Sequence, residues 1–182
     1  MGKLQQLLYS DASLLRKYAR GDAAAFEMLY RRHKDALFHF LHCSLPNAAI
    51  VEEIAQDSWV KVIEQAPHYK STAAFRTWLF TIARNRLIDH QRRKINNTPQ
   101  TDDSILQQRS SDDLPAEDQA LLRELLDALE LLPAEQRDSF LLQQQGFSNK
   151  EIAEITGVGT ETVKSRLRYA RSATRERMGA TS

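Results

Sequence analysis

Four basic side chains near the C-terminal end of the sequence are spaced for one helical face. Lys164, Arg168, Arg171 and Arg175 recur at intervals of three or four residues, and such intervals place side chains on the same side of an α-helix. Lys and Arg donate hydrogen bonds to guanine N7 and O6 and to phosphate oxygens. The pattern therefore predicts a helix that reads DNA through the major groove, and the alternative is an ordinary solvated helix face.

Residues 146–171 also predict how this helix is held. Ser148 and Glu151 can form an S-x-x-E capping box. Gly157 suits a helix end with positive φ, and Thr160 can cap the helix that follows. The contacts between the two helices should come from Ile152, Ala153, Ile155, Val158, Val163 and Leu167. Two short helices joined by a tight turn predict a helix-turn-helix, although a plain helical hairpin remains the alternative.

A second basic cluster lies at 84–94, where Arg84, Arg86, Arg92, Arg93 and Lys94 accompany one acid, Asp89. The helix expected here should bury an apolar stripe of Phe75, Trp78, Leu79, Ile82, Ala83 and Leu87. Its other side collects Thr77, Thr81, Arg84, Asn85 and Arg92, whose polar groups can bind bases or phosphates. Two basic clusters in one chain suggest two contacts with one polyanion.

Charge is divided along the chain, although the formal net charge is only +1. Residues 1–96 carry an excess of +6, residues 97–118 an excess of −5, and residues 119–182 no excess. The acidic stretch is rich in Asn, Asp, Ser, Gln and Pro and has few large apolar residues to bury. We therefore expect a flexible linker there.

Glycine and proline residues mark the expected ends of helices. The sequence has no run in which apolar and polar residues alternate, so no strand is predicted. The expected fold class is all-α, with two helical domains joined by a flexible acidic linker and a helix-turn-helix in the second domain. The expected helices cover 11–20, 22–44, 48–65, 72–94, 116–130, 133–145, 148–156 and 160–177, with Asp22 and Asn47 as caps. The expected domain boundaries are 1–96, 97–118 for the linker, and 119–182.

Several classes of protein are excluded or disfavoured. Cys43 is the only cysteine, which excludes internal disulfides and paired-cysteine zinc sites. No P-loop, GxSxG or HExxH motif is present, so we expect no enzyme, cofactor or small-molecule substrate. His33, His39, His42 and Cys43 could meet around a metal, but core packing explains them better and we expect no metal site. The sequence has neither a signal peptide nor about 20 consecutive apolar residues, which favours a cytoplasmic protein.

Three segments in order resemble an extracytoplasmic-function (ECF) sigma factor of bacterial RNA polymerase, a branch of the sigma-70 family. They are VEEIAQDSWVKVIE (51–64), FRTWLFTIARNRLIDHQRRK (75–94) and the helix-turn-helix. The resemblance covers nearly the whole chain. It implies that the first domain binds the polymerase core and the −10 promoter element, helping to melt the DNA, and that the second binds the −35 element. It also implies a stress or envelope-response regulon.

The resemblance assigns roles to individual residues. Glu53, Gln56, Asp57 and Lys61 would dock on the clamp helices of the largest polymerase subunit. Tyr69, Lys70, Ser71, Thr72 and Asn85 would capture an extruded −10 base, with Arg84, Arg92 and Arg93 on the DNA upstream. Lys164, Ser165, Arg168 and Tyr169 would read −35 bases, with Thr162, Arg166 and Arg171 nearer phosphate. The flap of the core enzyme and an anti-sigma factor are further partners that the resemblance implies.

Two other functions stay open at this point. One is a helix-turn-helix regulator that binds DNA without polymerase, and the other is a sigma-like decoy that titrates an anti-sigma factor. A decoy should lose its basic DNA-facing residues, whereas both basic clusters are intact here. The acidic linker also suggests a mimic of RNA in a basic channel. The sequence favours a working sigma factor.

Overall fold

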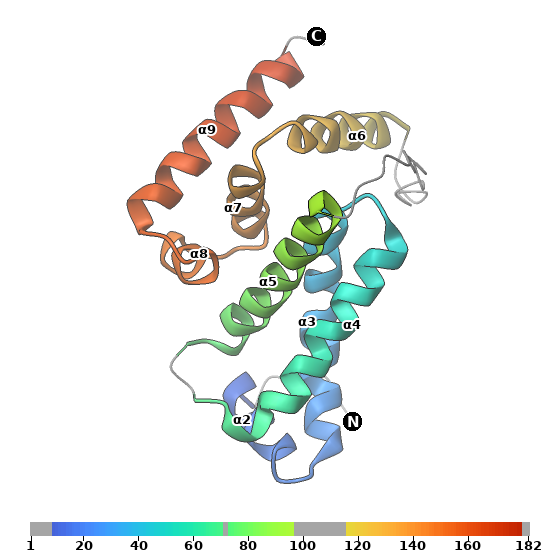
Figure 1. The fold of residues 1–182 in the computed structure, drawn as a ribbon, viewed down its shortest axis with the longest axis vertical. Helices are drawn as coiled ribbons and strands as arrows, with labels where there is room; N and C mark the ends of the chain where they lie inside the picture. Colours follow the sequence, from blue (N-terminus) through green and yellow to red (C-terminus); the bar gives the residue numbers. More distant parts are fainter. Residues whose placement is uncertain (1–8, 71–72, 97–115, 180–182) are drawn as a thin grey trace. The chain divides into compact units, whose positions relative to one another are not determined.

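The computed structural model describes residues 9–70, 73–96 and 116–179, which are helical and include no strand. The chain divides into two compact units. The N-terminal unit takes Met1–Leu41 and Ala49–Asp102, and the C-terminal unit takes His42–Ala48 and Asp103–Ser182. The elements in order are α2 (Asp11–Tyr18), α3 (Ala23–Ser44), α4 (Ala48–Gln65), the 3-10 turn η1 (Ala66–His68), α5 (Phe75–Asn96), α6 (Ala116–Glu130), α7 (Ala134–Gln144), α8 (Asn149–Thr156) and α9 (Thr160–Gly179) (Figure 1).

Aromatic rings join the helices of the N-terminal unit. Trp59 of α4 meets Phe26 of α3 edge-on, with ring centroids 5.8 Å apart. It also lies 6.4 Å from Phe75 of α5. Phe40 and Phe80 are fully buried and pack 5.5 Å apart, joining α3 to α5. Each such ring buries a large apolar area and favours tilted or edge-on contacts, so these rings hold the three helices at defined crossings.

An ion-pair cluster ties α2 to α3. The carboxylate of Asp11 accepts hydrogen bonds from the Arg32 guanidinium and from His33 Nε2, which lies 2.8 Å from Oδ2. The His33 ring is buried and lies 5.3 Å from the Phe75 ring of α5. Burial raises the pKa of Asp11, but the hydrogen bond and charge of His33, followed by those of Arg32, outweigh it. The pKa of Asp11 therefore lies below its ordinary value.

The Asp11 cluster should make the N-terminal unit sensitive to acid. Because the folded carboxyl has the lower pKa, its stabilisation is complete above about pH 4 and is lost as the pH falls through the folded pKa. Asp11→Asn should lower the free energy of unfolding at pH 7 by about 1–3 kcal/mol, and by less at pH 3. Urea unfolding followed by tryptophan fluorescence measures this, since both tryptophans lie in this unit.

Asp35→Asn is the matched control for that measurement. The Asp35 side chain is 89% exposed and its partner, Lys34, is 3.9 Å away. An exposed pair of this kind contributes little to stability, so this variant should unfold like the parent protein at both pH values. An equal loss of stability for Asp11→Asn at pH 7 and pH 3 would contradict the role of the Asp11 carboxylate.

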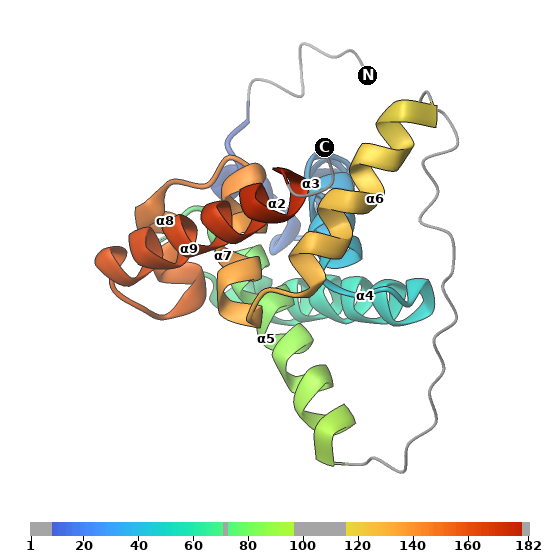
Figure 2. The same ribbon diagram turned by 90° about the horizontal axis from the view of Figure 1, so that it is seen from above.

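The C-terminal unit is built around α9, which packs against α6, α7 and α8. Figure 1 and Figure 2 both show α8 leading through a short turn into the long α9. Val163, Leu167, Ala170 and Thr174 form the buried stripe of α9, as their spacing predicts. The Thr174 hydroxyl donates to the Ala170 carbonyl oxygen at 2.8 Å, so even the polar member of the stripe is satisfied. The opposite face of α9 is left to solvent.

The all-α fold and the helix-turn-helix are confirmed, and the observed helices follow the predicted ranges closely. Helix α5 begins at Phe75 rather than residue 72, after the unpredicted turn η1. Helix α6 begins at Ala116, as the predicted helix 116–130 does, so residues 116–118 are helical although they were also counted in the expected linker. The rest of that linker, 97–115, lies outside the described residues. Within the described part of the chain, no helix is long and apolar enough to span a membrane.

Candidate nucleic-acid interface

Local signals in the sequence set the turn between α8 and α9. The Ser148 and Glu151 capping box is present: Glu151 N–H donates to Ser148 Oγ at 3.3 Å, and Ser148 N–H donates to Glu151 Oε2 at 2.8 Å. Gly157 ends α8 with φ 70°, in the left-handed region that glycine adopts without a Cβ clash. The predicted cap at Thr160 is wrong, because Val163 N–H donates to the Gly159 carbonyl oxygen and Gly159 therefore takes the cap position.

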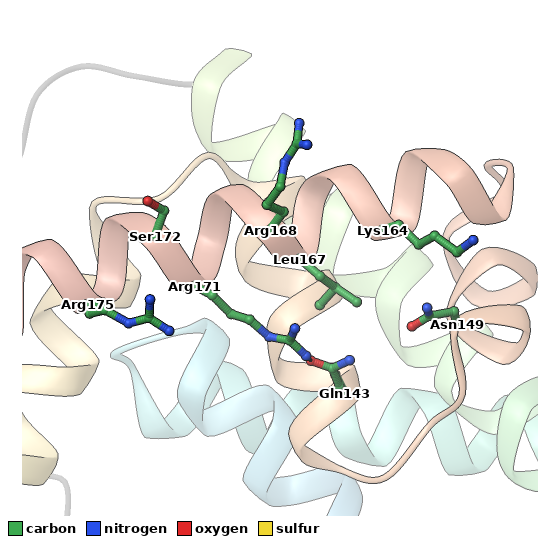
Figure 3. Close-up of a pocket in the computed structure, with 8 residues that line it drawn as sticks. All are labelled: Gln143, Asn149, Lys164, Leu167, Arg168, Arg171, Ser172 and Arg175. Carbon is green, nitrogen blue, oxygen red and sulfur yellow. The ribbon is translucent and has the colours of Figure 1, made fainter.

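A basic groove runs along α9 (Figure 3). Lys164, Arg168, Arg171 and Arg175 line one side, and Gln143 of α7 and Asn149 of α8 contribute to the other. In Figure 3, Lys164 extends toward the end of the groove marked by Asn149, while the Arg168 guanidinium points away from Gln143. The sequence predicted the four cations as one face, and the structure brings them together. Lys and Arg side chains arranged in this way can donate hydrogen bonds to phosphate oxygens or to base edges.

Two of these cations are held by neighbours. Arg171 Nη2 donates to Gln143 Oε1 at 2.7 Å, a contact across 28 residues of sequence. Lys164 Nζ donates to Glu161 Oε1, also at 2.7 Å, within the first turns of α9. Neither Gln143 nor Glu161 was predicted as a site residue. The Gln143 contact is tertiary and has no sequence signal, whereas the i, i+3 spacing of Glu161 and Lys164 could have indicated that pair.

The residues predicted to contact the −35 element differ in exposure. Thr162, Lys164, Ser165, Arg168, Tyr169 and Arg171 are exposed. Tyr169 is 56% exposed, and the Arg168 guanidinium carbon lies 5.2 Å from its ring centroid. Arg166 is only half-buried, and its Nη1 is buried without a hydrogen-bond partner among the residues described. A contact of Arg166 with DNA would require this side chain to swing outward.

Gln143 should act as a positioning residue for Arg171. Gln143→Ala removes the acceptor that holds the guanidinium, so Arg171 must be ordered at the moment of DNA binding, at an entropy cost of about 0.5–1.5 kcal/mol. We expect affinity for a cognate promoter duplex to fall about two- to tenfold. The same substitution in an Arg171→Ala background should change nothing. Fluorescence anisotropy measures the duplex affinities of the parent protein, the two single variants and the double variant. If the losses of the two single variants add up in the double variant, the coupling of Gln143 to Arg171 is contradicted.

The N-terminal unit carries a hollow of about 420 Å³ next to the end of α4. It is lined by Gln65, His68, Tyr69, Lys70, Ala73 and Trp78. The Tyr69 and Trp78 rings lie 4.9 Å apart, and the Tyr69 hydroxyl donates to the Ala73 carbonyl oxygen at 2.8 Å. Pockets that bind small molecules span roughly 300–1,000 Å³, so the hollow has room for one base. Trp78, expected in the core, is half-buried and forms part of this wall.

The other residues predicted for the −10 element are distributed along α5. Asn85 is exposed and does not line the hollow, although it follows Trp78 by seven residues and so lies on the same face about 10 Å further along the axis. Arg92 continues that face and is exposed, as is Arg93. Arg84 is buried, at 8% exposure, and is not placed on an open surface here. Ser71 and Thr72 lie outside the described residues.

The α4 residues predicted to contact polymerase form a polar strip. Glu53, Gln56 and Asp57 are exposed, and half-exposed Lys61 donates to Glu64 at 3.0 Å. Beside them is an apolar hollow that was not predicted, lined by Phe26, Tyr30, Gln56, Trp59, Val60 and Ile63 among others. Tyr30, Val60 and Ile63 are 36%, 44% and 40% exposed. An exposed apolar patch with a polar rim is typical of a surface that binds another protein.

The histidines and Cys43 do not assemble a metal centre in the described part of the chain, where no three metal-ligating side chains cluster. His33 instead joins the Asp11 cluster. His39 is exposed, while His42 and Cys43 are half-buried.

Together the fold and the two surfaces define a two-part helical DNA-binding protein with an additional surface suited to a protein partner. Residues 29–95 match the Sigma-70 region 2 family, and residues 122–173 match the Sigma-70, region 4 family. The chain therefore belongs to the sigma-70 family, and within it to the ECF sigma factors of RNA polymerase, which are transcription initiation factors.

Individual relatives agree with this assignment. The RNA polymerase sigma factor CarQ of Myxococcus xanthus is 30% identical over 169 residues, which cover 91% of this chain and 95% of CarQ. The ECF RNA polymerase sigma factor SigL of Mycobacterium tuberculosis is 36% identical over 160 residues, covering 84% of this chain and 88% of SigL.

Two solved structures show the same fold. The sigma factor RpoE of Bartonella quintana, solved with the anti-sigma factor NepR, superposes with a TM-score of 0.69 at 25% identity, covering 85% of this chain and 96% of that one. CnrH, solved with the cytosolic domain of CnrY, gives a TM-score of 0.74 at 23% identity, covering 94% of this chain and 99% of that one. The likeness to CnrH concerns the fold alone.

Proposed function

We propose that the C-terminal region, residues 119–182, binds the −35 promoter element through the exposed face of α9. The observation that carries this proposal is the groove lined by Lys164, Arg168, Arg171 and Arg175 over a capped helix-turn-helix. In such motifs the second helix enters the major groove and its N-terminal residues meet base edges. Lys164, Ser165, Arg168 and Tyr169 are the base-reading set, and Thr162 and Arg171 lie nearer phosphate.

The N-terminal region, residues 1–96, binds the −10 element in this proposal. An extruded base needs a stacking surface and polar groups for its edge. The hollow beside Tyr69 and Trp78 supplies rings, and Lys70 and His68 supply polar atoms. Asn85 and Arg92 continue from Trp78 along one face of α5, so the strand leaving the hollow meets an amide and then a cation. Arg93 adds a second cation at that end.

Core polymerase docks on α4 in this proposal. Glu53, Gln56 and Asp57 provide a polar strip for the clamp helices, and the adjacent apolar hollow at Tyr30, Val60 and Ile63 supports a contact that excludes water. An anti-sigma factor that covered this surface would compete with the core enzyme.

A reconstituted transcription reaction tests the proposal. The purified protein is added to sigma-free bacterial core polymerase with a genomic promoter library, and the 5′ ends of the transcripts are sequenced. We expect starts that share two spaced upstream elements and that are lost with Lys164→Ala or Asn85→Ala. Absence of core binding and of specific starts, together with tight binding to duplex DNA alone, would instead indicate a conventional helix-turn-helix regulator.

A further inference from the structure

A buried histidine links α2 to the start of α5. His33 of α3 is 6% exposed, and its Nε2 donates to Asp11 Oδ2 of α2 at 2.8 Å. Its ring centroid lies 5.3 Å from that of Phe75, the first residue of α5. The Arg32 guanidinium donates to the other carboxylate oxygen of Asp11 and to the Tyr9 carbonyl oxygen. Both oxygens of the Asp11 carboxylate therefore have partners.

The ring contacts continue from Phe75 to the hollow proposed for a −10 base. Phe75 is 2% exposed and meets the Trp78 ring edge-on, with centroids 5.9 Å apart. Trp78 in turn packs on Tyr69 in the wall of the hollow. Helix α2 also contacts α5, which carries Trp78, and η1, which ends just before Tyr69. An unbroken set of contacts therefore leads from the Asp11 carboxylate to the hollow.

Histidine at position 33 combines two properties that a purely apolar ring lacks. Its ring packs on Phe75, and its N–H fixes the orientation of the ring through a hydrogen bond to a carboxylate, which is among the stronger hydrogen bonds in proteins. A buried N–H without an acceptor is costly, so loss of the Asp11 carboxylate would turn His33 toward water. Phe75 would then lose a neighbour, and a close-packed interior transmits such a change to the next ring.

We propose that His33, oriented by Asp11, is a positioning residue for the −10 hollow. It holds Phe75 in place, and Phe75 sets the Trp78 ring in the orientation that receives an extruded base. His33 itself is buried and does not reach DNA. A wall that is fixed before the base enters needs no ordering on binding, so it binds the base more tightly. This inference rests on the proposed function of the N-terminal region.

Binding of a single-stranded −10 oligonucleotide to the holoenzyme tests this inference. The oligonucleotide carries the non-template sequence of a promoter found with the transcription library, and fluorescence anisotropy measures its affinity. His33→Gln keeps a donor for Asp11 but removes the ring, whereas Asp11→Asn removes the charge that anchors the ring. We expect each variant to lower oligonucleotide affinity about three- to tenfold and to change affinity for core polymerase less than about twofold.

The two affinities separate positioning from stability. The hollow and the α4 residues proposed to contact the core enzyme belong to the same N-terminal unit, so partial unfolding lowers both affinities together. Misplacement of the Trp78 ring lowers only the oligonucleotide affinity. His39→Gln is the matched control, because His39 lies on the same helix as His33 but is exposed. Both affinities of this control should equal those of the parent protein.

A Trp78→Ala background tests the route of the effect. If His33 acts through Trp78, adding His33→Gln to Trp78→Ala should lower oligonucleotide affinity no further than Trp78→Ala alone. Parental oligonucleotide affinity in both His33→Gln and Asp11→Asn, or losses that add fully in the double variant, would overturn the inference. Equal losses of core and oligonucleotide affinity would also overturn it, because His33 would then only stabilise the fold. A parent holoenzyme that does not prefer the −10 oligonucleotide over a scrambled one would instead reject the proposed function itself.

Discussion

Lys164→Ala and Arg171→Ala should both reduce transcription from a cognate promoter, but in different ways. Lys164 is expected at base edges, where each good contact contributes about 1–3 kcal/mol of discrimination, so its loss should cost roughly five- to a hundredfold on the preferred sequence and far less on others. Arg171 is held toward the groove by Gln143 and is expected at a phosphate. Its loss should weaken binding by a similar factor on every −35 sequence.

Salt dependence separates the two effects. Removing a phosphate contact should reduce the slope of log affinity against log salt concentration by about 1, which we expect clearly for Arg171→Ala. Binding titrations with the holoenzyme at several salt concentrations, on cognate and scrambled −35 duplexes, measure both quantities. Arg123→Ala, at an exposed position of α6 outside the groove, is the control. Identical sequence profiles for Lys164→Ala and the parent would contradict base reading by Lys164.

Tyr69→Ala should block open-complex formation more than promoter binding. The Tyr69 ring packs on the Trp78 ring in the wall of the hollow, and stacking a base on an aromatic side chain contributes about 1–3 kcal/mol. We therefore expect about a five- to hundredfold loss of permanganate-reactive, melted promoter, with duplex binding through α9 retained. A pre-melted −10 template should restore part of the activity, because the cost of unpairing has been removed.

Tyr69→Phe distinguishes stacking from loop structure. Phenylalanine keeps the ring and removes the hydroxyl that donates to the Ala73 carbonyl oxygen. If the ring stacks on a base, this variant should melt promoters nearly as well as the parent does. If both variants fail equally, the hydroxyl holds the loop and base stacking on Tyr69 is refuted.

The sequence alone predicts much of this fold because the residues that begin and end the helices act on backbone groups only a few positions away. Asp22 accepts from Ala25 N–H at 3.2 Å, Gly157 has positive φ, and the Ser148 box forms as expected. The stripe of α9 also follows from spacing, because one side of that helix packs on the other helices of its unit while the other faces solvent. For such a helix, the spacing of the apolar residues is enough to predict which side chains are buried.

Helix α5 shows where periodicity is insufficient. Its predicted stripe omitted Phe80, which is fully buried against Phe40, and it left Thr77 and Arg84 on the polar side although both are buried. Because α5 contacts α2, α3 and α4, its buried arc is wider than a single stripe. Ile82, predicted in the core, is half-buried.

Parts of the candidate sites depend on tertiary contacts that have no local signature. Gln143 reaches Arg171 from another helix, and the hollow at Trp78 forms only when the turn η1 brings Tyr69 onto α5. The apolar hollow at Tyr30 and Ile63 is made by two helices whose sequences each look like ordinary amphipathic segments. Such features depend on how helices are placed relative to one another, and the spacing of residues within one helix does not predict that placement.

The capped turn between α8 and α9 has a consequence for folding speed. Its capping box and its left-handed glycine are satisfied within a few residues of sequence, and the two helices pack directly on each other. Structures dominated by such local contacts lose little chain entropy on closure and fold in roughly microseconds to milliseconds. We therefore expect the α8–α9 hairpin to form early, giving α6 and α7 a ready surface on which to assemble.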